Sequence, residues 1–198
     1  MLKVEHLEAW GFEHAVRGMR NPMNSWDKSD TIHDHVGDND LALMKKLHNA
    51  GTEHRKYLRQ IFVSMDITAP LYWWKEFDTY KIGTVANSCS TMHKIAAKKF
   101  ELEDFSTEHL FESSKSRLQV LLDLLNIYRD SYLICKDKNE WWQIIQLLPT
   151  SYNQKRTVTM NYEVVLTIIK QRTGHKLDEW KTLIDELYTL PYIEEIMN

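Results

Sequence analysis

The chain has 198 residues, of which 43% are hydrophobic and 27% are charged. This length and composition predict one globular domain that is large enough to bury a core. The formal net charge of −3 argues against a nucleic-acid partner, because a phosphate backbone is bound by clustered excess cations. No apolar run is long enough for a membrane span or a signal peptide, and two cysteines make no disulfide framework. We therefore expect a cytoplasmic protein without membrane association.

The N-terminal quarter predicts a strand, a short helix, a loop and a second helix. Residues 3–10 alternate loosely and are followed by Gly11, after which apolar residues recur at helical spacing. Residues 21–40 are rich in Asn, Asp and Ser, which favour turns, and so predict a long loop. Asp40 is expected to cap the next helix, which ends at Gly51.

A strand and an aromatic helix are predicted next. Residues 57–67 alternate in side-chain character, as a half-buried strand does. Pro70 suits the start of a helix, with Thr68 as the expected cap. Aromatic residues then recur at helical spacing up to Gly83, where the helix is expected to break.

The second half of the chain is predicted to be mainly helical. The expected segments are helices over 107–133 and 137–148, an extended piece over 156–159, a helix over 160–172 and one or two helices over 177–198. Strands placed among helices in this order predict a single α/β or α+β domain over residues 1–198, with a mixed sheet and packed helices.

The predicted helix over 160–172 places two polar residues on one face. Asn161 and Arg172 are eleven positions apart, which is about 1100° along a helix, so they point within about 20° of each other. Val165 and Ile168 lie between them on that face. One interpretation is a binding face with two polar ends. The other is a surface arginine that suits the negative C-terminal end of the helix dipole.

The segment Ile67–His93 joins the aromatic helix to a polar stretch, an arrangement that core packing does not require. It resembles the signature region of the flavin-dependent thymidylate synthases, in which Arg-His-Arg precedes an Asn-Glu-x-Ser-x-Arg series. Thr79-Tyr80-Lys81 stands at the position of the triplet. Asn87 and Ser90 match the asparagine and the serine of the series.

A second part of the family pattern lies in the C-terminal half. Leu148-Pro149 stands where the family has a Leu-Pro turn, and it is followed by Asn161 and Arg172 at a similar spacing. Glu53-His54 is similar to a pair that contacts flavin. The chain departs from the pattern at Glu163, where the family has an arginine two residues after the helix asparagine. With the N-terminal strand and helix, the resemblance spans nearly the whole chain.

The resemblance implies the thymidylate synthase-complementing-protein fold, FAD as cofactor and a homo-oligomer, a tetramer in this family. It also implies a methyltransferase of nucleotide metabolism that acts on a dUMP-like pyrimidine nucleotide with methylene-folate. The residues that it assigns to the nucleotide are Asn87, Ser88, Ser90 and Arg172. Those that it assigns to flavin are His54, Thr79, Tyr80, Lys81, Asn161 and Thr167. No residue is assigned to catalysis, because flavin and folate carry the hydride and the methylene group.

A non-catalytic homologue, acting as a nucleotide-binding or regulatory protein, is the second hypothesis. Ser88 and Met92 replace a glutamate and an arginine of the family series, and the Arg-His-Arg triplet is changed. Lys81 does not repair the loss of an arginine, because an ammonium group is a point charge without the planar fork of a guanidinium. The changed charges leave the two hypotheses open.

Two further positions have a chemical and a structural interpretation. Cys89 is either a nucleophile, with His93 as its base, or a small buried thiol. Arg59 lies in a basic cluster at the start of the predicted strand. It either reaches a ligand phosphate or keeps a solvated strand edge from pairing.

The loop around His33-Asp34-His35, with Asp38 and Asp40, contains residue types that bind metals. No second histidine or carboxylate motif at ligand spacing accompanies it. We therefore expect a solvated polar loop and assign no metal site.

Overall fold

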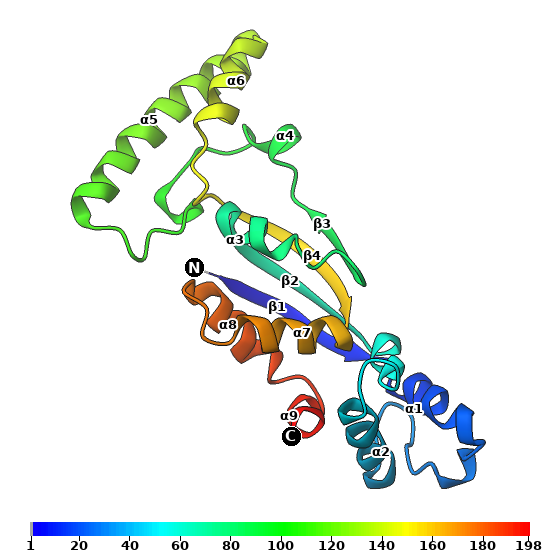
Figure 1. Cartoon of the computed structure of the whole chain (residues 1–198). Coiled ribbons are helices and arrows are strands. Elements are labelled where there is room, and N and C mark those ends of the chain that lie inside the picture. The colour runs from blue at the N-terminus through cyan, green and yellow to red at the C-terminus, as the bar shows by residue number, and fades with distance from the viewer. Residues whose placement is uncertain (1) are drawn as a thin grey trace. The chain divides into compact units, whose positions relative to one another are not determined.

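The computed structural model of the chain describes residues 2–198. Four strands form an antiparallel sheet in the order β1-β2-β4-β3 (Figure 1). They are β1 (Lys3–Trp10), β2 (Phe62–Pro70), β3 (Thr84–Ser88) and β4 (Asn153–Asn161). The predicted α+β class is confirmed. The sheet itself is antiparallel where the sequence predicts a mixed one, because β2 and β3 lie on either side of β4 and run opposite to it.

The chain groups into two compact units. The first unit comprises the residues up to Lys3 together with Thr68–Thr79 and Asn87–Arg156, and the second comprises Val4–Ile67, Tyr80–Ala86 and Thr157–Asn198. The single domain expected over residues 1–198 stays a prediction. Among residues 2–198, no helix combines the length and the apolar character that crossing a bilayer requires.

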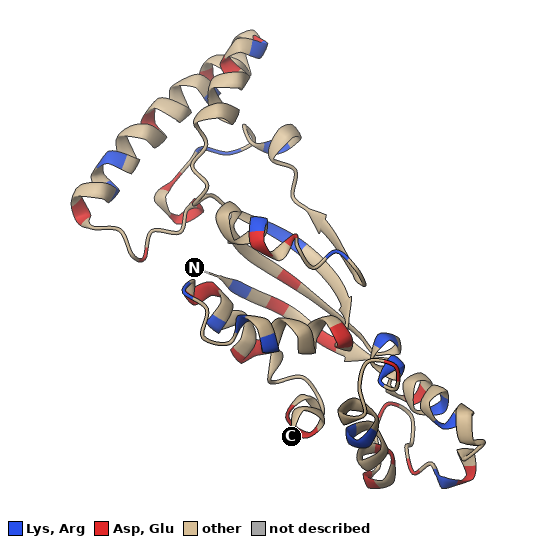
Figure 2. Ribbon diagram, in the orientation of Figure 1, with Lys and Arg blue, Asp and Glu red and all other residues tan. Residues whose placement is uncertain are grey.

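The first unit is organised around a helical hairpin. Its helices are α3 (Leu71–Phe77), α4 (Thr91–Lys94), the 3-10 helix η4 (Leu102–Asp104), α5 (Glu112–Cys135) and α6 (Lys138–Leu147). Leu122 and Leu125 of α5 and Ile144 of α6 are fully buried in one apolar cluster. Both acidic and basic residues occur along α5 (Figure 2). The hairpin thus buries one stripe of each helix and exposes the other to solvent.

Helix α5 begins at Glu112, later than the predicted start near residue 107. The preceding chain is extended, because Phe105 pairs with Tyr152 in an antiparallel bridge. Ser106 N–H also donates to the Ser151 carbonyl at 2.8 Å. Helix α6 starts as predicted, since Asp137 accepts a capping hydrogen bond from Asn139 N–H at 2.9 Å.

Helix α3 carries the aromatic stripe that the sequence predicts, and Trp73, Trp74 and Phe77 are buried. The predicted cap at Thr68 is wrong: Thr68 is still in β2, and the extended Pro70 is the residue that precedes the helix. The helix also ends at Phe77, before the predicted break at Gly83.

The second unit holds the remaining helices. They are α1 (Phe12–Arg20), the 3-10 helices η1 (Asn21–Met23), η2 (Trp26–Lys28) and η3 (Lys56–Gln60), α2 (Asp38–Asn49), α7 (Tyr162–Arg172), α8 (Asp178–Leu187) and α9 (Ile193–Met197). The strand and helix predicted at the N-terminus are confirmed as β1 and α1. The helices predicted on either side of Pro191 are confirmed as α8 and α9.

Asp40 has a different role from the predicted helix cap. Helix α2 begins two residues earlier, at Asp38, after an extended Gly37. The Asp40 side chain is fully buried and pairs with Arg20 at 2.5 Å, and Ser29 and Thr31 donate to its other oxygen. This carboxylate therefore holds residues 29–31 of the loop against the end of α1.

The strand predicted over 57–67 starts later than expected. Residues Lys56–Gln60 form the 3-10 helix η3, and β2 begins at Phe62. The apolar residues that suggest a strand are still buried, Tyr57 and Leu58 in η3 and Ile61 just after it. A 3-10 turn and a strand can bury the same residues, so burial alone does not distinguish them.

Candidate functional site

The clearest candidate site lies in the second unit, where residues 80–83 contact helix α7. At the C-terminal end of α7, the Tyr80 hydroxyl accepts a hydrogen bond from Arg172 Nε at 2.9 Å. Near its N-terminal end, Gly83 has a φ of +79, and a Cβ at this position would lie only 2.7 Å from Asn161 Nδ2. Residues 80–83 therefore lie close to Arg172 at one end of α7 and to Asn161 at the other.

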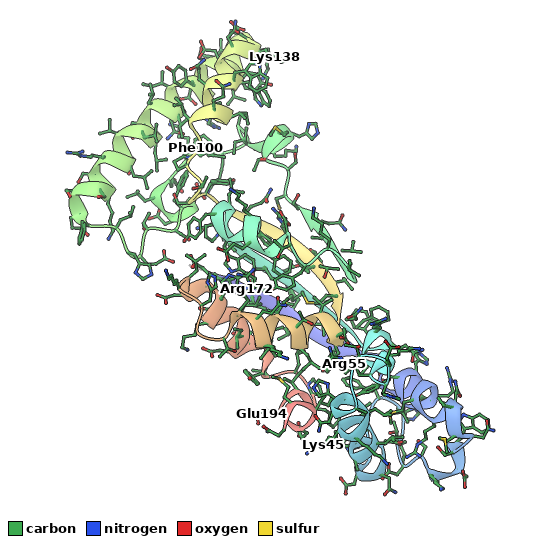
Figure 3. All side chains as sticks on the ribbon, in the orientation of Figure 1. Lys45, Arg55, Phe100, Lys138, Arg172 and Glu194 are labelled. Carbon is green, nitrogen blue, oxygen red and sulfur yellow. The ribbon has the colours of Figure 1, made fainter. Side chains whose placement is uncertain are left out.

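Arg172 is held by aromatic rings as well as by the tyrosine hydroxyl. Its guanidinium carbon lies 4.5 Å from the ring centroid of Trp180, which is fully buried, and 5.5 Å from that of Tyr80. The Tyr80 hydroxyl also donates to Gln171 Oε1 at 3.1 Å. Stacking on an aromatic face favours a cation over a neutral group and fixes the plane of the guanidinium. The arrangement presents a planar, permanently charged group at the end of α7 (Figure 3).

Asn161 is buried and caps helix α7. Its Oδ1 accepts a hydrogen bond from Val164 N–H at 3.1 Å. The amide oxygen therefore caps the N-terminus of the helix. Val165 and Ile168, between Asn161 and Arg172, are fully buried. The helix predicted over residues 160–172 is confirmed as α7, which begins two residues later than predicted, at Tyr162.

Glu163 and Thr167 lie one turn apart on the next face of α7. Arg55 donates from Nε to Glu163 Oε1 at 3.0 Å, and its terminal nitrogen forms an ion pair with the same oxygen at 2.8 Å. Figure 3 places Arg55 near the start of α7. Glu163 Oε2 is buried without a hydrogen-bond partner among residues 2–198. Thr167 Oγ1 donates to the Glu163 carbonyl at 2.7 Å. The carboxylate that stands in place of a family arginine is thus compensated by an arginine from another element.

The other two residues that the resemblance assigns to flavin in this unit, His54 and Lys81, are exposed. In the first unit, the remaining flavin residue, Thr79, is exposed and donates from Oγ1 to the Glu76 carbonyl at 2.8 Å. Each of these assignments stays a prediction.

The residues predicted to bind nucleotide in the first unit lie where β3 leads into α4. Asn87 and Ser88 are exposed at the end of β3. Ser90 caps α4 by accepting from His93 N–H at 3.0 Å. Cys89 is exposed, so the expectation of a small buried thiol is wrong. The strand at this point pairs through its backbone with β4, which leaves the side chain of Cys89 outside the core: Cys89 N–H donates to the Lys155 carbonyl at 2.9 Å.

Arg156 is a cation in the first unit that the sequence does not single out. Its guanidinium carbon lies 4.2 Å from the ring centroid of Trp74, and it donates to Asp78 at 2.8 Å and to Gln154 at 3.0 Å. Gln154 in turn donates to the Cys89 carbonyl at 2.7 Å. Arg156 is therefore linked to the β3–α4 segment through one side chain. The sequence signal for it is weak, because an arginine in an alternating strand is ordinarily a solvated residue.

The polar loop with metal-ligand residue types has structural roles. Asp34 accepts from Gly11 N–H and Glu13 N–H at the start of α1, and the hydrogen bond from Glu13 N–H lowers the pKa of the Asp34 carboxyl. Asp40 is committed to Arg20. Within the described part of the chain, no three His, Cys, Asp or Glu side chains are placed to share a metal ion. Arg59 lies in η3 and is exposed. It is therefore not on a strand, which both interpretations of this residue assume.

Comparison with known proteins identifies the fold. No family model matches the chain, and no curated protein matches its sequence. The structure of thymidylate synthase ThyX from Helicobacter pylori with FAD and dUMP is similar over 100% of both chains, with a TM-score of 0.77 and 16% identity. The UMP/dUMP methylase PolB from Streptomyces cacaoi, bound with 5-Br dUMP, is similar over 100% of this chain and 94% of its own, with a TM-score of 0.67 and 13% identity.

These identities establish the fold and nothing finer. The chain has the fold of the flavin-dependent thymidylate synthases, as the sequence predicts from two short motifs. The residues that would bind ligands are assigned by those motifs and by the local geometry.

Proposed function

We propose that the chain binds a dUMP-like pyrimidine nucleotide and uses Arg172 to hold its phosphate. The observation that carries this proposal is the fixed guanidinium of Arg172, held by Tyr80 and by the face of Trp180. A planar guanidinium matches the geometry of phosphate oxygens, and one that is already oriented loses little conformational entropy on binding. Asn87, Ser88 and Ser90 are assigned to the same ligand by the motif that they match.

The proposal extends to FAD as cofactor and to transfer of a methyl group that methylene-folate supplies. When bound, FAD would provide the hydride, and the protein would bind and orient the reactants. Asn161 and Thr167 would offer polar atoms from the cap and the body of α7, Thr79 and Tyr80 would offer hydroxyl groups, and Lys81 and His54 would add charge. We further propose the tetrameric assembly that the resemblance implies.

The charges fit a monophosphate better than the diphosphate of FAD. A diphosphate is ordinarily held by several fixed cations or helix N-termini. In the second unit, Glu163 puts a negative charge where the family pattern has an arginine. Arg55 forms an ion pair with Glu163, which neutralises its positive charge. Lys81 is exposed and is a weaker partner than a fork-shaped arginine.

This charge reversal favours a second candidate function, a nucleotide-binding or regulatory protein that does not use flavin. In that case Arg172 would still bind the nucleotide phosphate. The two candidates share the nucleotide and differ in the cofactor, so a measurement of each ligand separates them.

Titration calorimetry with dUMP tests the shared part. Arg172→Gln should weaken dUMP binding by about tenfold or more, the loss expected for one charge-assisted hydrogen-bonding group. Arg117→Gln, on the exposed surface of α5, is the matched control and should leave the affinity unchanged. Equal affinities for the two variants would exclude Arg172 from the site.

The visible absorption spectrum then separates the candidates. A yellow protein, or one that takes up FAD when it is added in excess, supports the enzyme. A colourless protein that binds dUMP and fails to take up FAD supports the second function. Rescue of a thymidine-requiring strain tests the full reaction.

A further inference from the structure

A cavity of about 310 Å³ lies in the second unit, beside the face of α7 that carries Thr167. Elements far apart in the sequence line it: α2, the chain before η3, α7, and residues at the end of α8 and in α9. The lining residues are His48, Arg55, Leu166, Thr167, Ile169, Lys170, Thr173, Tyr188 and Met197. The cavity is large enough for a small organic molecule, since ligand sites start at about this size.

The polar part of the lining is basic. Arg55, Lys170 and His48 line the cavity, and no acidic residue is among the lining residues. Glu163 balances Arg55 through the 2.8 Å ion pair. Lys170 is exposed and adds a positive charge that the lining does not balance. An anion that enters the cavity is therefore attracted by Lys170 and by the outer side of the guanidinium.

His48 has an unmet hydrogen-bonding atom here. Its Nδ1 is buried and has no partner among residues 2–198. Burial, and then the charge of Arg55, lower the pKa of His48, and Lys170 acts in the same direction while Glu163 opposes it. A buried ring nitrogen without a partner costs free energy. This nitrogen is closed to solvent, so a ligand in the cavity would contact other atoms of the His48 side chain.

Part of the cavity lining is apolar. Leu166 and Ile169 of α7 are buried, at 7% and 1% exposure, and Met197 of α9 completes the wall. Methionine adapts its shape to a flat or irregular ligand surface. The hydroxyls of Thr167 and Thr173 both donate to backbone carbonyls of α7, at 2.7 and 2.6 Å. Their oxygens still have lone pairs that can accept from a ligand donor.

We propose that this cavity binds a small organic anion, with a carboxylate or phosphate beside Lys170 and His48 and an apolar body against Leu166, Ile169 and Met197. The inference does not rest on the proposed function. Of its lining residues, Thr167 is also among those assigned to flavin, and the experiment below separates the two sites.

Benzoate is the probe, because it joins one carboxylate to a flat apolar ring. The measurement is the nuclear magnetic resonance signal of the His48 ring in the full chain, assigned with His48→Gln. Benzoate should shift this signal saturably and raise the pH at which it titrates. Benzamide, which lacks the charge, and acetate, which lacks the ring, should each bind about tenfold more weakly or worse. Phenyl phosphate in place of benzoate shows whether the site prefers phosphate or carboxylate.

Lys170→Gln should weaken benzoate binding about tenfold. Lys46→Gln, an exposed lysine of α2 that does not line the cavity, is the matched control and should have no effect. Both lysines are exposed, so neither change threatens the fold.

Two results would overturn the inference. Equal, non-saturating shifts from acetate and benzoate, or equal effects of the two lysine variants, would mean that the anions only screen surface charge. Loss of the benzoate shift when FAD is added, with an unchanged affinity for FAD in Lys170→Gln, would place the response in the flavin site. Failure of dUMP or FAD to bind, by contrast, bears on the proposed function and leaves the benzoate result unaffected.

Discussion

Gly83 is the residue at which the 80–83 segment comes closest to α7, and replacing it with alanine tests that approach. Its φ of +79 lies in the left-handed region, which costs an L-residue about 1–2 kcal/mol. The new Cβ would also lie 2.7 Å from Asn161 Nδ2, so the carboxamide has to move. Movement weakens the capping bond from Val164 N–H to Asn161 Oδ1, and such a cap contributes about 1 kcal/mol.

We therefore expect Gly83→Ala to lower the free energy of unfolding by about 2–3 kcal/mol. Gly174→Ala is the matched control. Gly174 has a similar φ of +76, and an added Cβ there meets no heavy atom within 4 Å. It should show the backbone cost alone, about 1–2 kcal/mol.

Urea unfolding followed by tryptophan fluorescence measures both variants, with equal m-values as the condition for comparing them. A double-mutant cycle with Asn161→Ala isolates the contact. In the Asn161→Ala background, Gly83→Ala should cost no more than Gly174→Ala does. The reasoning is refuted if the two glycine variants are equally destabilised in the intact protein. It is also refuted if the extra cost of Gly83→Ala persists after Asn161 has been truncated.

Three further predictions concern the pH dependence of stability, the helical hairpin and the site. Burial raises the pKa of the Asp40 carboxyl, but hydrogen bonds from Thr31, Ser29 and Arg20 outweigh burial and leave the pKa below its ordinary value. Asp40 therefore stabilises the fold above the unfolded pKa of about 3.9, and this contribution is lost as the pH falls through the lower, folded pKa. Asp40→Asn should cost about 3 kcal/mol at pH 7 and less near pH 3, as urea unfolding will show. Leu125→Ala, at a fully buried position of α5, should cost about 2–5 kcal/mol in the same assay. Tyr80→Phe removes the hydroxyl that accepts from Arg172 and should weaken dUMP binding about threefold to tenfold by calorimetry.

Each of these predictions has its own control. Asp38→Asn, in the first turn of α2 and exposed, should show little loss, and an Asp40→Asn penalty that does not depend on pH would contradict the linkage argument. Leu124→Ala, at 37% exposure, should cost much less than Leu125→Ala. For Tyr80→Phe, an unchanged affinity would show that the aromatic rings alone hold Arg172.

Much of the fold was accessible from local patterns. Alternation over residues 3–10, the helical spacing after Gly11, and the asparagine before the last long helix each correspond to an observed element. The errors arise where a distant residue takes over a local role. Asp40 has the chemistry of a helix cap, but Arg20, twenty positions earlier, pairs with its carboxylate. Local propensity contains no information about that partner.

The residues of the candidate site are named from the sequence, whereas their contacts become visible only in the structure. The eleven-residue spacing predicts Asn161 and Arg172 on one face of a helix. In the structure Asn161 is extended and precedes α7 as its cap. That Tyr80 would hold Arg172 does not follow from the sequence, because the two are 92 positions apart. Arg156 was missed for the same reason, since its partners Trp74 and Asp78 lie in a different element.

The pairing of Arg55 with Glu163 has a consequence for how this chain relates to others of its fold. Where the family pattern has an arginine, Glu163 accepts a hydrogen bond from Arg55 and forms an ion pair with it. An arginine at position 163 alone would set two guanidinium groups against each other and leave both without a counter-charge. The two positions are therefore expected to change together, and an acidic residue at 55 should accompany an arginine at 163 in related sequences. Residues 55 and 163 considered together would then distinguish sequences in which this face of α7 is acidic from those in which it is basic.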